Sequence, residues 1–271
     1  MKKFTVLSLN VWIIILFLNI EAHATERIVI LAPAAVDVVE RLGAGEGVVG
    51  VTNSVAEFPE AMRVGTHISP GLELIASLKP TLIIATSRFS PEAAGRTGAE
   101  LFIYEPKDLE GIIIACETLG EKLGRENEAK HLALELKSIL AELAPVKNSP
   151  TVLYEVRSNP LSVAKDSSII KSMLEAAGMR YAFSGIAGTL SAEYLLVNQP
   201  DYYIYQEGPM NKNPMEPIKR PGWKNFRACT WKVDELEFAR ANTQVFDKVL
   251  ELNRILAGTS PCDEGRKLYG R

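Results

Sequence analysis

A short pattern occurs twice in this chain of 271 residues, once near the middle of each half. In each copy a glutamate near a helix start is followed seven residues later by a proline and then by a short apolar run. The first copy contains Glu73 and Pro80, and the second contains Glu193 and Pro200, each 120 positions further on. A repeat of this kind predicts two similar lobes. Two-lobed proteins usually bind their ligands in the gap between the lobes.

The first 24 residues have the features of a secretory signal peptide. Lys2 and Lys3 precede an apolar stretch over residues 11–18, and the small-residue site Ala22-His23-Ala24 follows it. This predicts cleavage after Ala24 and a periplasmic protein. An uncleaved membrane anchor is the alternative, which the shortness of the apolar stretch disfavours. No later segment is long and apolar enough to span a bilayer.

Composition limits the classes of partner. The formal net charge of −3 gives no electrostatic footprint for nucleic acid, so we expect no nucleic-acid partner. Cys116, Cys229 and Cys262 lack the spacing of metal ligands, and their odd number leaves at least one thiol unpaired. The sequence does not assign a disulfide.

Strand and helix patterns alternate along the chain. Apolar runs predict strands at 27–31, 48–51, 82–85, 100–104 and 152–156, and helical periodicity predicts helices at 33–42, 125–143, 167–177 and 243–256. Such alternation implies parallel sheets covered on both faces. The expected organisation is a leader at 1–24, an N-terminal lobe at 25–124, a connecting helix at 125–144, a C-terminal lobe at 145–258 and a tail at 259–271.

Candidate ligand-binding residues lie in loops expected at the carboxyl ends of the strands, where open α/β sheets collect ligands. These loops combine flat apolar side chains with basic groups, which suits a bulky, partly anionic small molecule. The candidates are Phe58, His67, Arg88, Phe89, Arg157, Tyr205 and Trp223. Each aromatic side chain could instead pack in the core, and each arginine could instead form a surface ion pair.

The paired glutamates allow two interpretations. A carboxylate in the first turn of a helix is stabilised by about 0.3–1 kcal/mol through the helix dipole, so each glutamate alone could be a helix cap. Their equivalent places in the two lobes favour matched contacts to a partner with two-fold symmetry, in which Glu73 and Glu193 each pair with an arginine.

Signals for catalysis are missing from the sequence. It contains no Gly-x-Ser-x-Gly nucleophile elbow, no phosphate-binding loop with a lysine, and no recognisable acid–base pair. His67 and His131 are the only histidines after the leader, and a receptor for bare metal ions would need several histidine and carboxylate ligands. We therefore expect a protein that is not an enzyme and has no cofactor or resident metal site.

Several segments together resemble the periplasmic binding proteins for iron–siderophores, haem and cobalamin. They are Arg27–Pro33, Leu42–Gly45 with Val48–Thr52, Leu72-Glu73 with Leu78–Pro80, and Arg220–Trp223. The resemblance covers the whole mature chain and implies an α/β fold with two Rossmann-like lobes of parallel sheets, joined by one long rigid helix. This is the class III periplasmic-binding-protein fold. It also implies a metal chelate in the cleft and delivery to the permease dimer of an ABC transporter in the inner membrane, with Glu73 and Glu193 as the docking residues.

Departures from the family pattern bear on the ligand. Ala34-Ala35-Val36-Asp37 stands where the family often has Ser-x-Thr-Glu, and Arg240 matches one pocket arginine while Gln244 replaces a second. Leu236 occupies the acidic position of cobalamin-binding relatives, although Glu235 or Glu237 could compensate. The leading expectation is an iron–siderophore complex. A cobalamin or haem receptor, a receptor for a molybdate-type oxyanion, and a ligand sensor are the alternatives.

Overall fold

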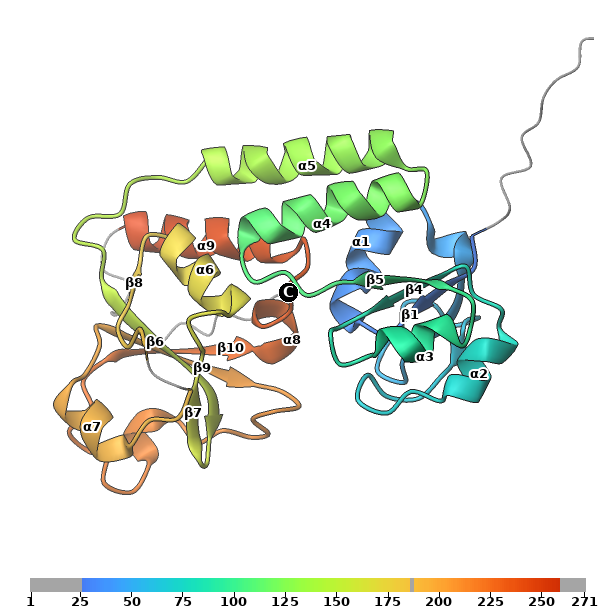
Figure 1. Cartoon of the computed structure of the whole chain (residues 1–271). Helices are drawn as coiled ribbons and strands as arrows, with labels where there is room; N and C mark the ends of the chain where they lie inside the picture. The colour runs from blue at the N-terminus through green and yellow to red at the C-terminus, as the bar shows by residue number, and fades with distance from the viewer. Residues whose placement is uncertain (1–25, 186–187, 259–271) are drawn as a thin grey trace, which may run out of the picture.

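The computed structural model describes residues 26–185 and 188–258, so the predicted leader and C-terminal tail lie outside the described residues. The chain forms two lobes, each built on one sheet (Figure 1). The N-terminal sheet has the order β3-β2-β1-β4-β5 and is parallel throughout. Its strands are β1 (Ile28–Ile30), β2 (Val48–Val51), β3 (Met62–Arg63), β4 (Leu82–Ala85) and β5 (Glu100–Ile103).

The C-terminal sheet has the order β10-β9-β6-β7, and β8 pairs with the first residues of β6 on the edge opposite β9. Its strands are β6 (Thr151–Ser158), β7 (Leu161–Val163), β8 (Arg180–Tyr181), β9 (Tyr202–Glu207) and β10 (Cys229–Asp234). The expectation of parallel sheets is wrong at β7, which runs antiparallel to β6. The chain reverses at Asn159-Pro160 without the long crossover that a parallel neighbour requires.

Nine α-helices occur in the described ranges. They are α1 (Val36–Arg41), α2 (Leu72–Ser77), α3 (Pro91–Gly95), α4 (Leu109–Lys122), α5 (Glu126–Ala141), α6 (Ile169–Ala176), α7 (Ala192–Val197), α8 (Glu235–Phe238) and α9 (Val245–Ala257). Three single 3-10 turns add η1 (Pro33–Ala35), η2 (Gly45–Gly47) and η3 (Pro217–Lys219). None of these helices combines the length and apolar character that a membrane crossing requires.

The repeat in the sequence is a repeat in the structure. Helices α2 and α7 begin and end 120 positions apart, and strands β4 and β9 begin at the same interval. The orders β2-β1-β4-β5 and β8-β6-β9-β10 are also equivalent in the two sheets. The expectation of two similar α/β lobes is therefore confirmed.

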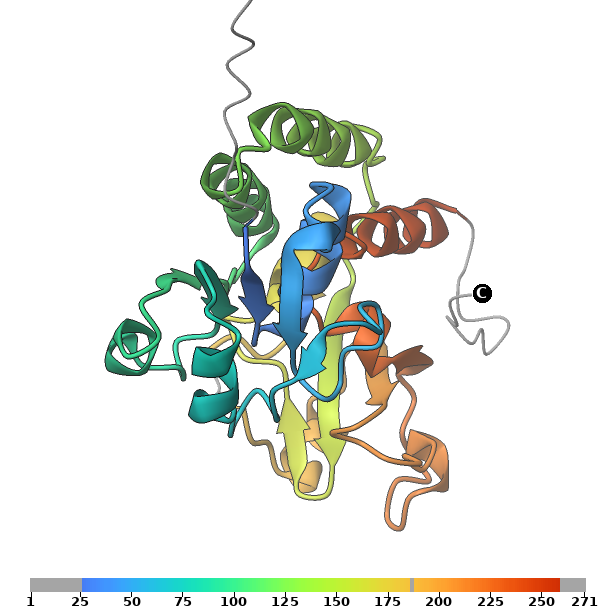
Figure 2. The same ribbon diagram turned by 90° about the vertical axis from the view of Figure 1, so that its right-hand side faces the viewer.

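Helix α5 connects the lobes and packs beside α4, as both views show (Figures 1 and 2). Gly124 separates the two helices in a left-handed conformation with φ of 60°. Gly120 lies inside α4, where an added Cβ would come within 2.3 Å of the Ala129 Cβ. Gly124 thus lets the chain reverse between the helices, and Gly120 lets the two helices approach closely.

Alternate residues of the strands enter different cores. Ile28 and Ile30 on β1 and Tyr202 and Ile204 on β9 face a large cluster that is continuous between the lobes beneath α1, α4, α5, α6 and α9. Their neighbours in the strands face two separate smaller clusters, one under α2 and α3 and the other under α7. The lobes thus share one core on the side of α5 and keep separate cores on the opposite side.

Hydrogen bonds join the lobes where the carboxyl ends of their sheets meet. Tyr104, directly after β5, donates from its hydroxyl to the Ala241 carbonyl at 2.7 Å. The Asp37 carboxylate of α1 accepts from the Thr243 amide at 2.9 Å and the Thr243 hydroxyl at 2.6 Å. Arg41 donates to the same hydroxyl at 2.9 Å and to Glu135 of α5 at 2.5 Å. These contacts supplement the shared core in fixing the angle between the lobes.

Candidate ligand-binding and docking sites

A cavity lies in the C-terminal lobe, between the end of β6, β7 and the start of α6, and is called here the β6–α6 cavity. It has a volume of about 480 Å³. Basic and hydroxyl side chains line it together with apolar ones, and the polar members are Arg157, Ser162, Lys165, Ser167, Ser168 and Thr189. Arg157 and Lys165 are exposed, so their charges face solvent at this cavity. The cavity can accept an anionic group of a ligand that also has apolar surface.

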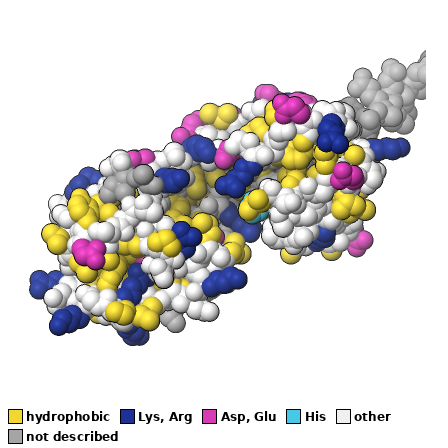
Figure 3. Space-filling view, turned by 60° about the horizontal axis from the view of Figure 1, so that its bottom comes forward, with side chains coloured by type: hydrophobic (Ala, Val, Ile, Leu, Met, Phe, Trp, Pro, Cys, Tyr) yellow, Lys and Arg dark blue, Asp and Glu magenta, His cyan; other side chains and the backbone are white. Residues whose placement is uncertain are grey.

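A second cavity of about 400 Å³ continues from this one to the lobe junction. Ser167 and Ser168 line both cavities, and Lys107 and Asp108 contribute from the N-terminal lobe. The space-filling view shows a hollow between the lobes, with Lys and Arg side chains gathered around it (Figure 3). The open space therefore extends from the junction into the C-terminal lobe.

The N-terminal lobe contributes a pocket of about 420 Å³ beyond β2 and β3. Its lining residues are Asn53, Ser54, Thr66, His67 and Ile68. The turn is closed by two hydrogen bonds, in which the Thr66 hydroxyl accepts from the Ser69 amide at 3.0 Å and the Thr66 amide donates to the Ser69 carbonyl at 3.3 Å. This tight turn leaves the imidazole of His67 exposed at the carboxyl edge of the sheet.

The other candidates occupy different surroundings. Phe58 is half-buried against the shared core, with its ring edge beside Gly45. Phe89 packs on the small N-terminal core, while Arg88 before it is exposed. Tyr205 and Trp223 are buried in the small C-terminal core. The structure thus brings Arg157 into the β6–α6 cavity and His67 into the N-terminal pocket, and it places these aromatic side chains in packing positions.

Arg240 lies just after α8, next to the segment that bonds to the N-terminal lobe. It is half-buried, and its charge acts on the nearby buried carboxylate of Glu235. Burial raises the pKa of Glu235, and a hydrogen bond from the Met210 amide at 2.7 Å opposes this shift. Since Met210 lines the β6–α6 cavity, Glu235 holds part of the cavity wall in place.

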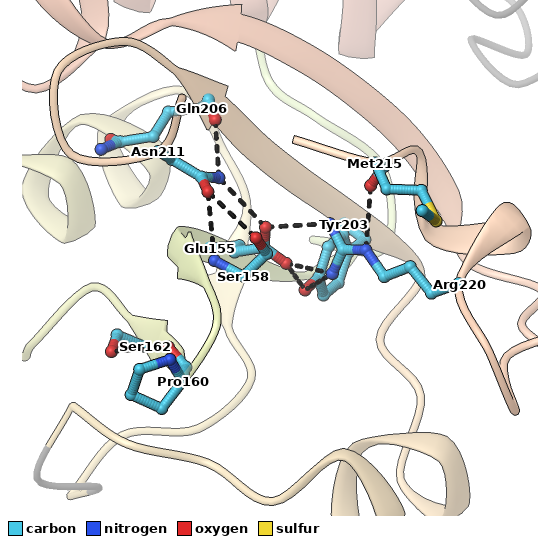
Figure 4. Close-up of polar contacts among 9 residues, drawn as sticks. All are labelled: Glu155, Ser158, Pro160, Ser162, Tyr203, Gln206, Asn211, Met215 and Arg220. Carbon is cyan, nitrogen blue, oxygen red and sulfur yellow. Dashed lines mark hydrogen bonds and ion pairs between the residues drawn. The ribbon is translucent and has the colours of Figure 1, made fainter. Parts of the chain in front are cut away.

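A buried polar network, which the sequence does not reveal, supports the same wall (Figure 4). Glu155 on β6 is fully buried and forms an ion pair with Arg220, including a bond of 2.9 Å from Nη2 to Oε1. The Tyr203 hydroxyl donates to the same carboxylate, as does the Asn211 amide at 3.2 Å. The pKa of Tyr203 is raised well above its ordinary value by burial and by the Glu155 charge, so its hydroxyl keeps the proton that it donates.

The network anchors the loop after β9. Asn211 accepts from the Ser158 amide at 3.2 Å and donates to the Gln206 carbonyl at 2.9 Å, which fixes the segment that carries Met210. Arg220 also lies 4.9 Å from the centre of the Trp223 ring. In the sequence, the one sign of this network is Glu155 within an otherwise apolar strand. Its partner Arg220 lies 65 positions away, and no local pattern links the two residues.

The predicted docking glutamates occupy matching exposed places. Glu73 is in the first turn of α2 and Glu193 is in the first turn of α7, both on the side of the molecule away from α5 (Figure 1). The buried anchors Ile75 and Leu195 hold the two helices on their lobes. The carboxylates are therefore presented outward from rigidly attached helices.

The two described cysteines are in different chemical states. Cys229 takes part in a disulfide, whereas Cys116 is a buried free thiol whose pKa burial raises to about 12. In residues 26–185 and 188–258, no three His, Cys, Asp or Glu side chains are grouped so that they could hold a metal ion.

Comparison with known proteins agrees with the fold. The family model for periplasmic binding proteins matches residues 28–230, so the chain belongs to this family. This is a family of substrate-binding proteins of transporters, and the chain is accordingly a binding protein and not an enzyme.

Relatives and solved structures match over most of the chain. The vitamin B12-binding protein of Photorhabdus laumondii is 24% identical, over 86% of this chain and 90% of the relative. The Fe(3+)-citrate-binding protein YfmC of Bacillus subtilis is 26% identical, over 75% and 70%. The structure of S. aureus IsdE complexed with heme superposes with a TM-score of 0.73 at 22% identity, over 86% and 99%. This last similarity supports the class III periplasmic-binding-protein fold.

Proposed function

We propose that this protein captures an anionic metal chelate between its lobes, an iron–siderophore or similar ferric complex, and delivers it to an ABC importer of the inner membrane. It does so as a periplasmic protein, after removal of the leader. The observation that carries the proposal is the open space that reaches from the lobe junction to Arg157 and Lys165. The N-terminal lobe adds the pocket that His67 lines. Two relatives are named for binding vitamin B12 and Fe(3+)-citrate, and these names support a metal chelate as the ligand class.

The charge of the cavity favours an anionic chelate. Guanidinium and ammonium groups at one cavity bind carboxylate or phenolate oxygens of a ferric complex, while Val156, Val163 and Ile170 contact its apolar parts. The metal arrives as cargo within the chelate, so the protein needs no cofactor and no ligands of its own for a bare ion.

A thermal-shift screen of the mature protein tests the ligand class. The panel contains ferric citrate, ferric siderophores, cobalamin, haem and molybdate, because a ligand that binds only the folded state stabilises it by RT ln(1 + [L]/Kd). We expect a shift with an anionic ferric chelate. A shift with cobalamin or molybdate alone would contradict the proposal.

Variants of the cavity sharpen this test. Arg157→Ala combined with Lys165→Ala should weaken binding of the active chelate about 10- to 100-fold, because two charge-assisted contacts are removed. Lys130→Ala on the exposed face of α5 is the matched control and should bind as the wild type does. Equal affinity of all three proteins would place the ligand elsewhere.

Delivery to the importer rests on the two glutamates. Glu73→Lys combined with Glu193→Lys should abolish chelate uptake by cells while leaving chelate affinity within about twofold, since neither side chain lines a described cavity. Loss of affinity together with uptake would mean that these residues belong to the ligand site instead.

A further inference from the structure

Each docking glutamate is followed by an exposed apolar side chain. Leu74 is 46% exposed and Tyr194 is 50% exposed, again 120 positions apart. One turn further along α7, Val197 is 83% exposed, whereas the equivalent position on α2 is the polar Ser77. The residue directly after Leu74 is Ile75 and the residue directly after Tyr194 is Leu195, and both are fully buried. The acidic and apolar residues before them therefore face outward together on each short helix.

Nothing among the described residues accounts for this exposure. A single exposed apolar residue is ordinary, but the same acid-and-apolar pair at equivalent places in two lobes is not expected by chance. Tyr194 is held by an edge contact with Phe183, whose ring centre lies 5.8 Å away, and half of its surface still faces solvent. The ring is therefore fixed in an outward position.

We propose that each lobe docks on the permease through a combined patch, which is Glu73 with Leu74 on one lobe and Glu193 with Tyr194 and Val197 on the other. This inference rests on the proposed function and adds to it the chemistry of the partner surface. The permease subunits present an apolar side chain beside each cation that receives a glutamate. The C-terminal patch makes the larger apolar contact, because it has two exposed apolar residues where the N-terminal patch has one.

Charge and symmetry select this occupant. A second copy of the chain docking through the same patches would set glutamate against glutamate, and an anionic lipid surface would repel both acids. Two patches related by the internal repeat fit two equivalent subunits, because a dimer with two-fold symmetry offers the same surface twice.

Site-specific photocrosslinking identifies the contact in intact cells of the source organism. A photoreactive amino acid is placed at Leu74, Tyr194 or Val197, with Leu134 on the exposed face of α5 as the matched control, since it is 67% exposed on the opposite side. We expect adducts with a membrane-spanning subunit of an ABC importer at the three patch positions, identified by mass spectrometry. Absence of these adducts, or equal yield at Leu134, overturns the inference.

Binding to that importer, purified in lipid nanodiscs, separates the apolar contact from the charge contact. Tyr194→Ser combined with Val197→Ser should weaken docking about tenfold and Leu74→Ser about threefold, with little dependence on salt. Leu134→Ser should have no effect. The charge reversals of Glu73 and Glu193 should weaken docking in a manner that depends strongly on salt.

The two hypotheses fail in different ways. If the charge reversals weaken docking and the apolar variants do not, this inference is wrong and the proposed function stands. If the apolar variants weaken docking and the charge reversals do not, the assigned role of the glutamates is wrong and the apolar contact remains. Chelate affinity and melting temperature of every variant are measured alongside. An apolar variant that loses both is misfolded and is replaced by the alanine substitution, whereas loss of affinity by a folded charge-reversal variant places the glutamates in the ligand site.

Discussion

The two lobes keep the same outline but differ in their interiors. Both place a short helix before an equivalent strand, with Ile75 and Leu195 as buried anchors. The interior of the N-terminal lobe is almost wholly apolar, with Thr52 as its buried polar residue among those described. The C-terminal lobe encloses the ion pair of Glu155 and Arg220. Both lobes thus have the exposed glutamate and the buried anchor, while the lobe that contains the β6–α6 cavity also has a buried polar network.

The two lobes also differ in the side chain that bonds the repeat to the first strand. In each lobe, the residue directly after the repeat proline accepts a hydrogen bond from a backbone amide at the start of that strand. In the N-terminal lobe the Thr81 hydroxyl accepts from the Arg27 amide at 3.0 Å. In the C-terminal lobe the Asp201 carboxylate accepts from the Thr151 amide at 2.7 Å. The same structural position is therefore neutral in one lobe and ionised in the other.

Removing Arg220 should have the largest effect on this comparison. Arg220→Met leaves the buried Glu155 carboxylate without its counterion, and we expect a loss of about 3–5 kcal/mol in the free energy of unfolding. Combining it with Glu155→Leu should recover much of that loss, because no charge then remains buried. Urea denaturation measures both. Additive losses in the double variant would show that the network does not act as a pair.

Truncating the two anchors compares the lobes directly. Ile75→Ala and Leu195→Ala should each cost about 2–5 kcal/mol, because each leaves a cavity in a separate small core. Their costs should add, since the two cores share no residue. Denaturant unfolding of the single and double variants tests this, and a coupling above about 1 kcal/mol would mean that the small cores are not independent.

Cutting the bridge between the lobes should have a moderate effect. Thr243→Val removes the hydroxyl that donates to the Asp37 carboxylate and accepts from Arg41, and it should cost about 1–3 kcal/mol. The backbone amide at position 243 still donates to Asp37, so Asp37→Ala provides the stricter version of the same test. Small-angle X-ray scattering should show a wider spread of lobe angles in both variants. Unchanged scattering would assign control of the lobe angle to the shared core alone.

The smallest expected effect is a difference between the lobes in how the free energy of unfolding depends on pH. Hydrogen bonds from the Thr151 side chain and backbone lower the pKa of Asp201 below 3.8. A lowered carboxyl pKa stabilises the folded state at neutral pH, and this contribution is lost as the pH falls below 3.8. Because solvent screens this exposed carboxylate, Asp201→Asn should cost only about 0.5–1 kcal/mol near pH 7 and less near pH 3. The control is Thr81→Val in a Glu26→Gln background, because the Thr81 hydroxyl also donates to the Glu26 carboxylate at 2.6 Å. Its cost, measured by the same denaturation series, should stay constant over this range, since no carboxylate then bonds to the position.

The outcome for the candidate site differed by residue type. Arg157 and His67 were found at cavities because long basic side chains and turn residues stay near the surface wherever their loops lie. Tyr205 and Trp223 were predicted for the cleft from their loops, but burial of large aromatic surface placed them in the core. The structure shows where these side chains lie, and ligand binding remains a proposal for all of them.

Local sequence determined the elements that form within about ten residues. The spacing from Glu73 to Pro80 and from Glu193 to Pro200, together with the apolar runs that follow, was enough to predict the repeated helix and strand, because periodicity and proline act through nearby backbone. Tertiary structure alone decided the core shared between the lobes and the pairing of Glu155 with Arg220. These features depend on contacts between residues far apart in the chain, which form only when the two sheets and the helices around them are packed together.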